Sequence, residues 1–261
     1  MKSVLIVYLL FALLLAGCSS PQKESPPPAA TPPAASTPAT PVYEEVTVEN
    51  AGTISGTVKF AGAKPKLAPR PVSSRNPEVC GHGAKPSEEV LLGEGGALRN
   101  VVVYLDGIKK GKRMPSTSPV LDQKKCDYTP HVQVVAAGST LDILNSDDLL
   151  HNVHGKLNGR ETVFNYAMPL KGQKFSKQLP KPGVINLQCD AGHTWMKAYI
   201  VVVDNPYYQT TDSKGTFALT EVPPGDYRVK AWHEKYGVQE QNVTVSAGGD
   251  SKVTFEFKPA G

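Results

Sequence analysis

Residues 183–203 read Gly-Val-Ile-Asn-Leu-Gln-Cys-Asp-Ala-Gly-His-Thr-Trp-Met-Lys-Ala-Tyr-Ile-Val-Val-Val. Ile185, Leu187 and Cys189 recur at period two, so they are predicted to share the inward face of one strand. Small and polar residues then indicate a turn. Ile200 to Val203 form a nearly continuous apolar run, as expected for a central strand. This stretch therefore predicts strand, turn and strand, and with them a β-sheet fold.

Apolar residues recur at every second position in other parts of the chain as well. Apolar residues alternate over 54–60, 227–232 and 253–257, each bounded by Gly or Pro, and 101–105 is a second nearly continuous apolar run. No long helical period interrupts these strands after the N-terminal segment. We therefore predict an all-β chain that folds as two sandwiches.

Residues 1–18 have the pattern of a secretory signal. Met1 and Lys2 give a positive start, 4–15 is almost entirely apolar, and small residues precede Cys18. The apolar run is shorter than the roughly twenty residues that a spanning helix needs. Leu15-Ala16-Gly17-Cys18 resembles the bacterial lipobox, which implies acylation of Cys18, and Ser19 after it resembles lipoproteins sorted to an outer membrane. The alternative is an ordinary signal with a chance cysteine.

Residues 19–45 are predicted to be a disordered tether. Up to Pro41 they are mostly Pro, Ala, Ser and Thr, and only Lys23 and Glu24 are charged. This composition cannot bury a core and favours extended polyproline II. At about 3.1 Å per residue the tether could hold a domain up to roughly 70 Å from a lipid surface.

Composition excludes several functions. A formal net charge of +4 over 261 residues and the absence of a basic run argue against nucleic-acid binding. The chain has no Cys-x-x-Cys-His sequence for covalent haem and no nucleophile with a base at recognisable spacing, so we expect no enzymatic activity and no small-molecule substrate. Without Cys18, three cysteines remain in an exported chain, which leaves one unpaired thiol for another role.

Two turn motifs resemble the carboxypeptidase regulatory-like (transthyretin-like) β-sandwich. They are Asp212-Ser213-Lys214-Gly215 and Pro223-Pro224-Gly225, with Gly supplying the positive φ that such turns need. The resemblance implies earlier Val-rich strands, which lie far upstream at 56–58 and 100–105. It therefore predicts a regulatory-like sandwich from 46–118 plus 205–258, with 119–204 inserted between the two parts. Two sequential domains are the alternative.

The stretch 119–204 resembles the cupredoxins, small blue-copper electron carriers with a Greek-key sandwich. Residues 128–134 and 138–145 resemble their first strands, and Asn145-Ser146-Asp147 followed by His151-Asn152-Val153 resembles the segment that carries their first copper ligand. Cys-x-x-x-His-x-x-Met follows at 189–196. The resemblance implies one type 1 copper ion with four ligands, namely His151, Cys189, His193 and Met196.

The residue types suit copper by themselves. A thiolate, two imidazoles and a thioether serve both oxidation states of copper. Three residues separate Cys189 from His193, where many small cupredoxins have two, and a binuclear centre of the cytochrome oxidase type would need a cysteine where Ile185 stands. Asp190 stands where many cupredoxins have Ser or Thr. Whether Asp190 and Asn152 form the hydrogen bond that supports the ligands from outside is therefore left open by the sequence.

The remaining cysteines and histidines allow two interpretations. Cys80 and Cys126 are most simply a disulfide that pins the loop before the inserted domain to its first strand. With His82 and His131 they could instead form a second metal site. His154 is predicted to lie on the face opposite His151 and to point to solvent, with an accessory metal role as the alternative. We assign His233 to sandwich structure.

We therefore predict a lipid-anchored electron carrier with one type 1 copper, held at the outer membrane and facing the periplasm, or at the cell surface. Its partners are expected to be redox proteins associated with a membrane. One alternative is a copper storage or delivery protein, against which the four Met of the whole chain argue. The other is a structural or carbohydrate-binding lipoprotein whose copper site is empty.

Overall fold

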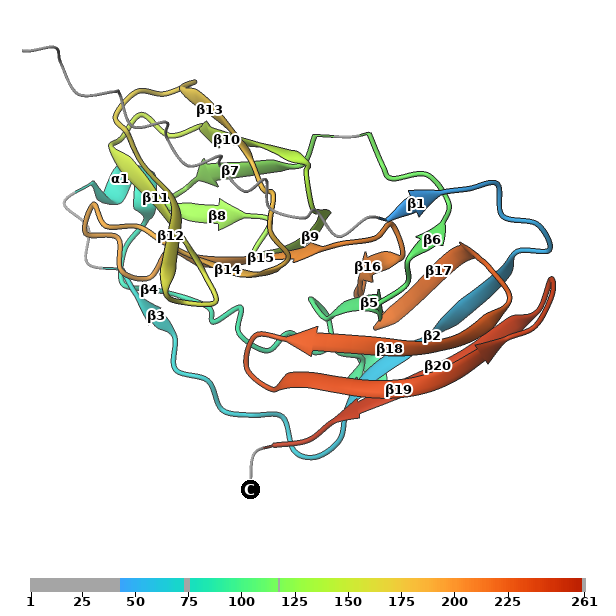
Figure 1. The fold of residues 1–261 in the computed structure, drawn as a ribbon. Coiled ribbons are helices and arrows are strands. Elements are labelled where there is room, and N and C mark those ends of the chain that lie inside the picture. The colour runs from blue at the N-terminus through green and yellow to red at the C-terminus, as the bar shows by residue number, and fades with distance from the viewer. Residues whose placement is uncertain (1–42, 73–75, 117, 260–261) are drawn as a thin grey trace, which may run out of the picture. The chain divides into compact units, whose positions relative to one another are not determined.

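The computed structural model describes residues 43–72, 76–116 and 118–259, and nearly all regular elements in them are strands (Figure 1). The helical elements of these ranges are one turn of α-helix, α1 (Pro77–Cys80), and one 3-10 turn (Glu94–Gly96). Neither is long and apolar enough to cross a membrane. The prediction of an all-β chain is confirmed.

Residues 120–203 form two sheets that share one core, and we call them the central sandwich. The strand orders are β13-β10-β7-β8 and β12-β11-β14-β15-β9. Apolar side chains of both sheets belong to a single buried cluster. A two-sheet sandwich over this stretch is what the sequence predicts. Its strands are β7 (Val120–Lys124), β8 (Asp127–Thr129), β9 (Val132–Ala136), β10 (Thr140–Asn145), β11 (His151–Leu157), β12 (Glu161–Met168), β13 (Lys174–Gln178), β14 (Gly183–Gln188) and β15 (Lys197–Val203).

A second pair of sheets, which we call the flanking sandwich, has the orders β16-β5-β18-β19 and β17-β2-β20. It encloses its own buried cluster. Two small ribbons, β1-β6 and β3-β4, complete the described elements. The remaining strands are β1 (Glu44–Glu45), β2 (Gly52–Phe60), β3 (Arg70–Pro71), β4 (Ala84–Lys85), β5 (Val102–Asp106), β6 (Lys110–Gly111), β16 (Tyr208–Thr210), β17 (Thr216–Val222), β18 (Gly225–His233), β19 (Gly237–Val245) and β20 (Asp250–Phe257).

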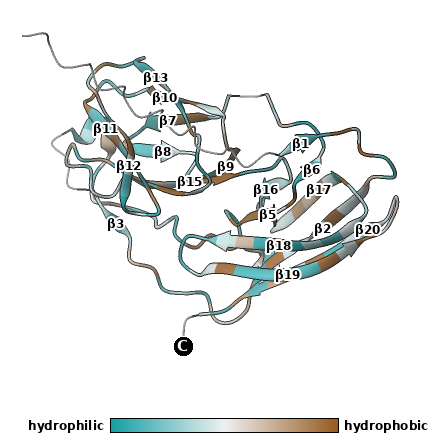
Figure 2. Ribbon diagram, in the orientation of Figure 1, coloured by the Kyte–Doolittle hydropathy of each residue, from teal (hydrophilic) through white to brown (hydrophobic). Residues whose placement is uncertain are grey.

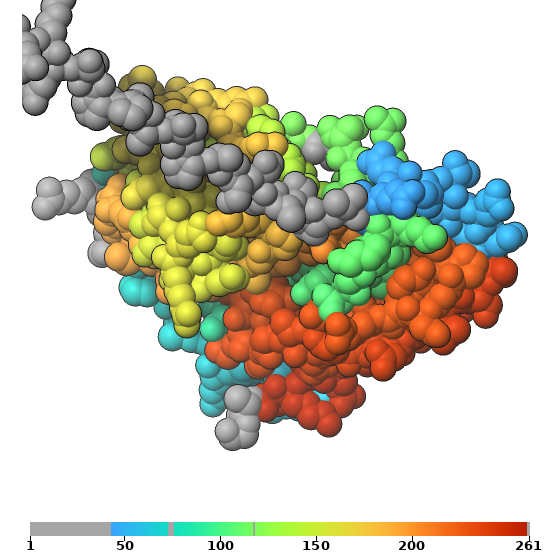
Figure 3. Space-filling view, in the orientation of Figure 1, coloured from blue at the N-terminus to red at the C-terminus, as the bar shows by residue number. Residues whose placement is uncertain are grey.

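The flanking sandwich combines early and late parts of the chain. β2 pairs with β17 and β20, and β5 pairs with β16 and β18. The space-filling view shows blue and green early residues among orange and red late ones (Figure 3). Strands from before residue 119 and from after residue 204 therefore share both sheets.

β19 is an edge strand, and its sequence suits that position. Most of its residues are exposed or half-buried, and Figure 2 shows it as mostly hydrophilic. Polar and charged side chains on an edge strand discourage pairing with another chain. The inward-facing residues of its neighbour β18 are fully buried, as with Val229 and Ala231.

A third buried cluster joins strands of the two sandwiches. Beside it, His131 Nε2 lies 2.5 Å from the Glu234 carboxylate, and His131 Nδ1 lies 3.1 Å from the Lys197 carbonyl oxygen. His131 thus contributes polar contacts beside this apolar cluster. The buried members of the cluster are Val102, Val132, Val201, Val203 and Trp232.

Two sequence predictions need correction. Residues 43–45, predicted as the end of the tether, are ordered, because Glu44 and Glu45 pair with β6 and the Tyr43 hydroxyl donates to the Lys112 carbonyl. The predicted strand over 128–134 is wrong as a single strand. β8 and β9 belong to different sheets, and Pro130 between them lacks the N–H that a continuous ladder would need.

Residues 1–42 lie outside the described part of the chain. The predicted signal with Cys18 and most of the predicted tether fall there.

Candidate metal centre

The structure brings His151, Cys189 and His193 together at one end of the central sandwich. Their ligand atoms lie within 4.8 Å of one another, and all three residues are buried. The two Nδ1 atoms of His151 and His193 are 3.1 Å apart, and Cys189 Sγ is 3.5 Å from His193 Nδ1. Three potential metal ligands therefore converge on one point.

Strand periodicity explains why two of them point inward. β11 alternates between buried and half-buried residues from its first residue, so His151 shares its inward face with Val153. Cys189 directly follows β14 and continues the inward row of Ile185 and Leu187, as the sequence predicts. His193 comes from the turn between β14 and β15.

The Cys189 sulfur lies among backbone donors. The Asn152 N–H points to Sγ at 3.4 Å. Burial raises the pKa of the Cys189 thiol, although the N–H groups of Asn152, Ala191 and His193 act in the opposite direction. A metal cation would displace the thiol proton, because the thiolate is the form that binds metals.

The Asp147 carboxylate determines which ring nitrogen of His151 carries the proton. Its carboxylate oxygen Oδ2 lies 2.8 Å from His151 Nε2. Because a carboxylate only accepts, Nε2 carries the proton and Nδ1 keeps its lone pair toward the other ligands. Asp147 lies four residues before His151 in the segment quoted for the cupredoxin resemblance, yet sequence reasoning gave it no role. A carboxylate at that spacing from a ligand histidine was the available signal.

Trp195 holds the second histidine. Its ring meets the His193 ring edge to face, with centroids 5.2 Å apart. The Trp195 indole N–H donates to the Cys126 carbonyl at 2.9 Å. Burial lowers the pKa of His193, and the proximity of the His151 imidazole acts in the same direction. His193 is therefore a neutral imidazole near neutral pH. Sequence reasoning missed Trp195, because its partner lies far back in the chain.

Met196 is fully buried on the same turn, and its backbone N–H donates to the His193 carbonyl at 2.9 Å. Met168 is a second buried methionine, paired in register with His151. Its sulfur already accepts from the Gln123 amide at 2.9 Å. Met196 is therefore the better of these two for a thioether ligand.

Asn152 and Asp190 tie the two ligand-bearing segments together. The Asp190 N–H donates to Asn152 Oδ1 at 3.2 Å. His154 lies on the opposite face of β11 from His151. Its Nδ1 is 2.7 Å from the Asp190 carboxylate and its Nε2 is 2.9 Å from the Thr162 hydroxyl. With a side chain only 12% exposed, His154 is held at the surface of the sandwich and does not project freely into solvent.

Cys80 and Cys126 form a disulfide. Their sulfurs lie beside His193, within 4.8 Å of its ring nitrogen. The groups of possible metal ligands among the described residues contain neither His82 nor His131. The second metal site that the sequence left open is therefore not assembled. His233 is buried and stacks on Tyr236, which agrees with a structural role.

The spacing of the three donor atoms fits one metal ion. Tetrahedral bonds of about 2.0 Å to nitrogen and about 2.3 Å to sulfur place two nitrogens about 3.3 Å apart, and nitrogen and sulfur about 3.5 Å apart. The corresponding separations here are 3.1 and 3.5 Å. Two imidazole lone pairs that face each other at this distance need a proton or a cation between them. The residues therefore fit a metal that accepts nitrogen and soft sulfur.

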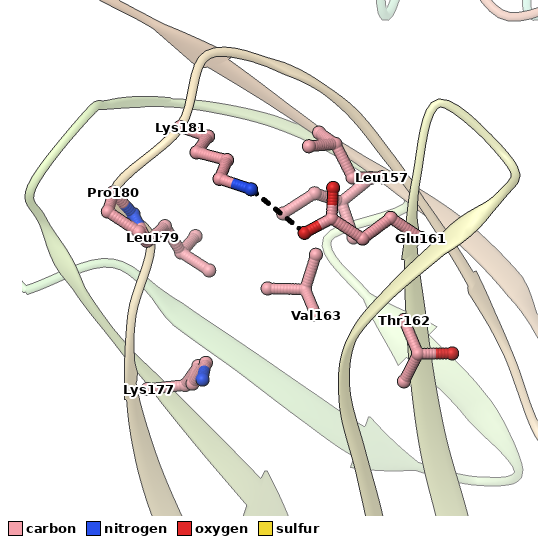
Figure 4. A pocket seen from close by; sticks show the side chains of 9 residues that line it. Leu157, Glu161, Thr162, Val163, Lys177, Leu179, Pro180 and Lys181 are labelled. Carbon is pink, nitrogen blue, oxygen red and sulfur yellow. Dashed lines mark hydrogen bonds and ion pairs between the residues drawn. The ribbon is translucent and has the colours of Figure 1, made fainter. Parts of the chain in front are cut away.

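A separate pocket lies away from these donors, at one margin of the central sandwich. Leu157, Val163, Leu179 and Ile185 line it, and the Lys181 ammonium pairs with Glu161 at 3.0 Å (Figure 4). None of the four predicted copper ligands lines it.

Comparison with protein families finds one match in this chain. The carboxypeptidase regulatory-like domain family matches residues 190–258. The match begins in the turn between β14 and β15 and extends through β20. It therefore covers the late strands of the flanking sandwich and none of its early ones. No match was found among curated proteins.

Solved structures with partial similarity include three copper proteins. A copper-containing nitrite reductase from Thermus scotoductus SA-01 is 20% identical over 36% of this chain and 24% of its own, with a TM-score of 0.30. A reduced Cu(I) form of an amicyanin variant is 25% identical over 35% of this chain and 87% of its own, with a TM-score of 0.30. A purple cupredoxin from Nitrosopumilus maritimus is 20% identical over 33% of this chain and all of its own, with a TM-score of 0.29. TM-scores this low give no support to a function.

Proposed function

We propose that this chain is an electron-transfer protein with one type 1 copper ion held by His151, Cys189, His193 and Met196. The observation that carries the proposal is the convergence of three buried donors, with His151 Nδ1 freed toward them by the Asp147 carboxylate. A thiolate, two imidazoles and a weak thioether form the ligand set of blue-copper sites.

Copper, when bound, would supply a one-electron Cu(II)/Cu(I) couple. The protein contributes burial and rigidity. His151 and Cys189 continue inward rows of strands, and the Asn152 N–H donates to the sulfur. The Asp190 to Asn152 bond joins the two segments. Ligands that are held in place need little rearrangement when the charge of the ion changes, which suits electron transfer and not catalysis on a substrate.

The test of the ligand set uses Cu(II) added in one equivalent to the purified protein. We expect an intense visible absorption from thiolate-to-copper charge transfer, lost in Cys189→Ala and in His151→Ala. His154→Ala is the matched control, because His154 lies on the same strand with its side chain on the other face. A colourless copper complex, or a colour that depends on His154 and not on His151, would contradict the assignment.

We further propose that Cys18 is lipid-modified and holds the protein at a membrane facing the periplasm, where its partners are redox proteins at the same surface. The support is the Leu15-Ala16-Gly17-Cys18 pattern and the Pro-rich segment after it. The Cys18→Ala variant is expected not to be labelled by radioactive palmitate. It should also no longer be found in the membrane fraction. An unlabelled, soluble wild-type protein would refute this proposal.

A further inference from the structure

We propose that the Cys80–Cys126 disulfide is a positioning element of the metal centre: it holds the Lys125–Cys126 turn, and that turn holds Asp147 and Trp195 against the two histidine ligands. The inference rests on the proposed copper function for its consequence, whereas the positioning itself concerns residues that the structure shows in contact.

The Lys125–Cys126 turn needs outside support. It joins β7 to β8, and both of its residues have positive φ, 53° and 54°, although neither is glycine. Such backbone is unfavourable for residues with a Cβ and persists only when surrounding contacts impose it. The disulfide is one such contact. The Lys85 ammonium, which donates to both turn carbonyls, is another.

The turn reaches the first histidine through Asp147. The backbone N–H of Lys125 donates to Asp147 Oδ1 at 2.7 Å, and the N–H of Cys126 donates to Oδ2 at 2.8 Å. The same Oδ2 accepts from His151 Nε2. The two turn N–H groups therefore hold the Asp147 carboxylate in position, and the carboxylate sets the tautomer and orientation of the His151 ring.

The turn reaches the second histidine through Trp195. The Cys126 carbonyl accepts the indole N–H, and the Trp195 ring contacts His193. Arg70 adds a bond from Nη1 to the Trp195 carbonyl at 3.3 Å. Cys126 thus contacts the support of the first histidine with its N–H and the support of the second with its carbonyl, while its sulfur is bonded to Cys80.

The disulfide fastens Cys80, which lies between β3 and β4. β3 and β4 are also fastened separately, because Arg70 and Lys85 both pair with Asp127, at 2.8 and 2.6 Å. These ion pairs remain when the disulfide is removed, so β3 and β4 are expected to stay in place. The change should then be local to α1, the turn and the residues that it holds.

The competing interpretation is that the disulfide only stabilises the fold, as most exported disulfides do. General stabilisation would leave the histidine tautomer and the copper spectrum of folded protein unchanged. Positioning would change both. These two readouts therefore separate the interpretations at a temperature where the variants remain folded.

The experiment compares wild type with Cys80→Ala/Cys126→Ala and with Leu179→Ala. Leu179 is a buried core residue that lines the pocket in Figure 4, and none of the supports named above lines that pocket, so its loss is a matched destabilising control. In copper-free protein, long-range nitrogen–proton NMR should show His151 as the Nε2–H tautomer in wild type and in Leu179→Ala. The disulfide variant should show a mixture of tautomers.

With Cu(II) added, the disulfide variant should bind at least about tenfold more weakly, as outer supports of metal ligands typically contribute. It should also show a shifted visible band and EPR hyperfine coupling. Identical tautomer and spectra in the disulfide variant, or equal changes in Leu179→Ala, would overturn the inference. A wild type without any thiolate band would refute the copper function instead, and the tautomer result alone would then decide the positioning role.

If the disulfide variant does not fold, Trp195→Phe keeps the disulfide and an aromatic ring beside His193, and deletes the indole bond to Cys126 together with part of the ring. It should perturb the His193 ring signals in the copper-free protein and shift the copper spectrum. Unchanged His193 signals and an unchanged spectrum would overturn the inference.

Discussion

At the scale of single residues, Asp147 is the group on which the proposed metal centre depends most. Two carboxylate oxygens accept three donors, from Lys125, Cys126 and His151. The backbone of Asp147 is also held in place, because its own N–H donates to the Asn145 side chain at 3.1 Å. One acidic residue thus links the turn between β7 and β8 to a ligand from the other sheet.

Asp147→Asn is expected to weaken Cu(II) binding by about 10- to 100-fold, because the amide turns one acceptor into a donor that faces two N–H groups. Loss of the negative charge should also raise the reduction potential, since Cu(II) loses more stabilisation than Cu(I). Copper titration and voltammetry measure these effects. Asp142→Asn is the control, because Asp142 on β10 pairs with Lys174 and Ser176 at the surface. Equal effects of the two variants would contradict this role for Asp147.

The sequence identified the candidate ligands but not their supports. Cys189, His193 and Met196 follow one another closely and could be recognised by type and order. The contacts of Asp147 depend on a turn about twenty residues earlier that carries neither Gly nor Asn, the usual signals of positive φ. The Trp195 bond spans 69 residues. Such long-range partners leave no local pattern.

At the scale of elements, the flanking sandwich depends on a close approach of β2 to β20. The two strands are parallel neighbours in register from Thr53 to Phe60. A Cβ added at Gly56 would lie 1.7 Å from the Val253 carbonyl oxygen, which belongs to backbone and cannot move aside without disturbing the ladder. This explains why the alternating strand at 54–60 carries a glycine in its middle.

Gly56→Ala is therefore expected to lower the free energy of unfolding by about 3 kcal/mol, near the upper end of the usual cost of overpacking. Gly159→Ala is the comparison, because its Cβ would enter open space, although its φ of +71° still costs about 1 kcal/mol. Urea unfolding followed by circular dichroism measures both. A loss at Gly56 no greater than at Gly159 would contradict the close approach.

Periodicity located the strands better than it located their ends. The alternating runs at 54–60, 227–232 and 253–257 lie within β2, β18 and β20. The prediction missed the break at Pro130, where the chain crosses from one sheet to the other. Alternation reports which side of a strand is buried, whereas the choice of sheet is set by packing with distant strands.

At the scale of the whole molecule, His131 and Glu234 connect the two sandwiches. Burial by itself lowers the pKa of His131, but the bond and charge of Glu234 and the charge of Glu88 outweigh it, so the pKa is raised. His233, next in sequence to Glu234, behaves in the opposite way. Burial, together with the charges of His131 and Lys235, lowers its pKa to about 4.

The stabilisation from protonated His131 is complete below its unfolded pKa of about 6.5 and is lost as the pH rises through its raised folded pKa. Glu234→Gln should therefore lower the free energy of unfolding most at pH 6 and progressively less toward alkaline pH. His233 contributes between about pH 4 and pH 6.5, so the change in the difference above pH 6.5 reports on His131. His82→Gln, at an exposed site, is the control. A pH-independent difference would contradict the coupling.

We also propose that 119–204 is a domain inserted in the flanking sandwich. The buried cluster of the flanking sandwich contains no residue from that range. Replacing 119–204 with a short Gly-Ser linker should therefore leave a protein that unfolds cooperatively on heating. Loss of any cooperative transition would contradict the proposal. Residues 119–204 produced alone should be less stable than the shortened flanking sandwich. The central sandwich would then lose Cys80 and the ion pairs of Arg70 and Lys85.

The most direct test of the central claim is the EPR spectrum of the protein with one equivalent of Cu(II), recorded with its visible spectrum. A type 1 site predicts one copper per chain, a small parallel hyperfine coupling and an intense thiolate-to-copper band, and all three should disappear in Cys189→Ala. A large hyperfine coupling without an intense band, or a spectrum that Cys189→Ala leaves unchanged, would contradict it.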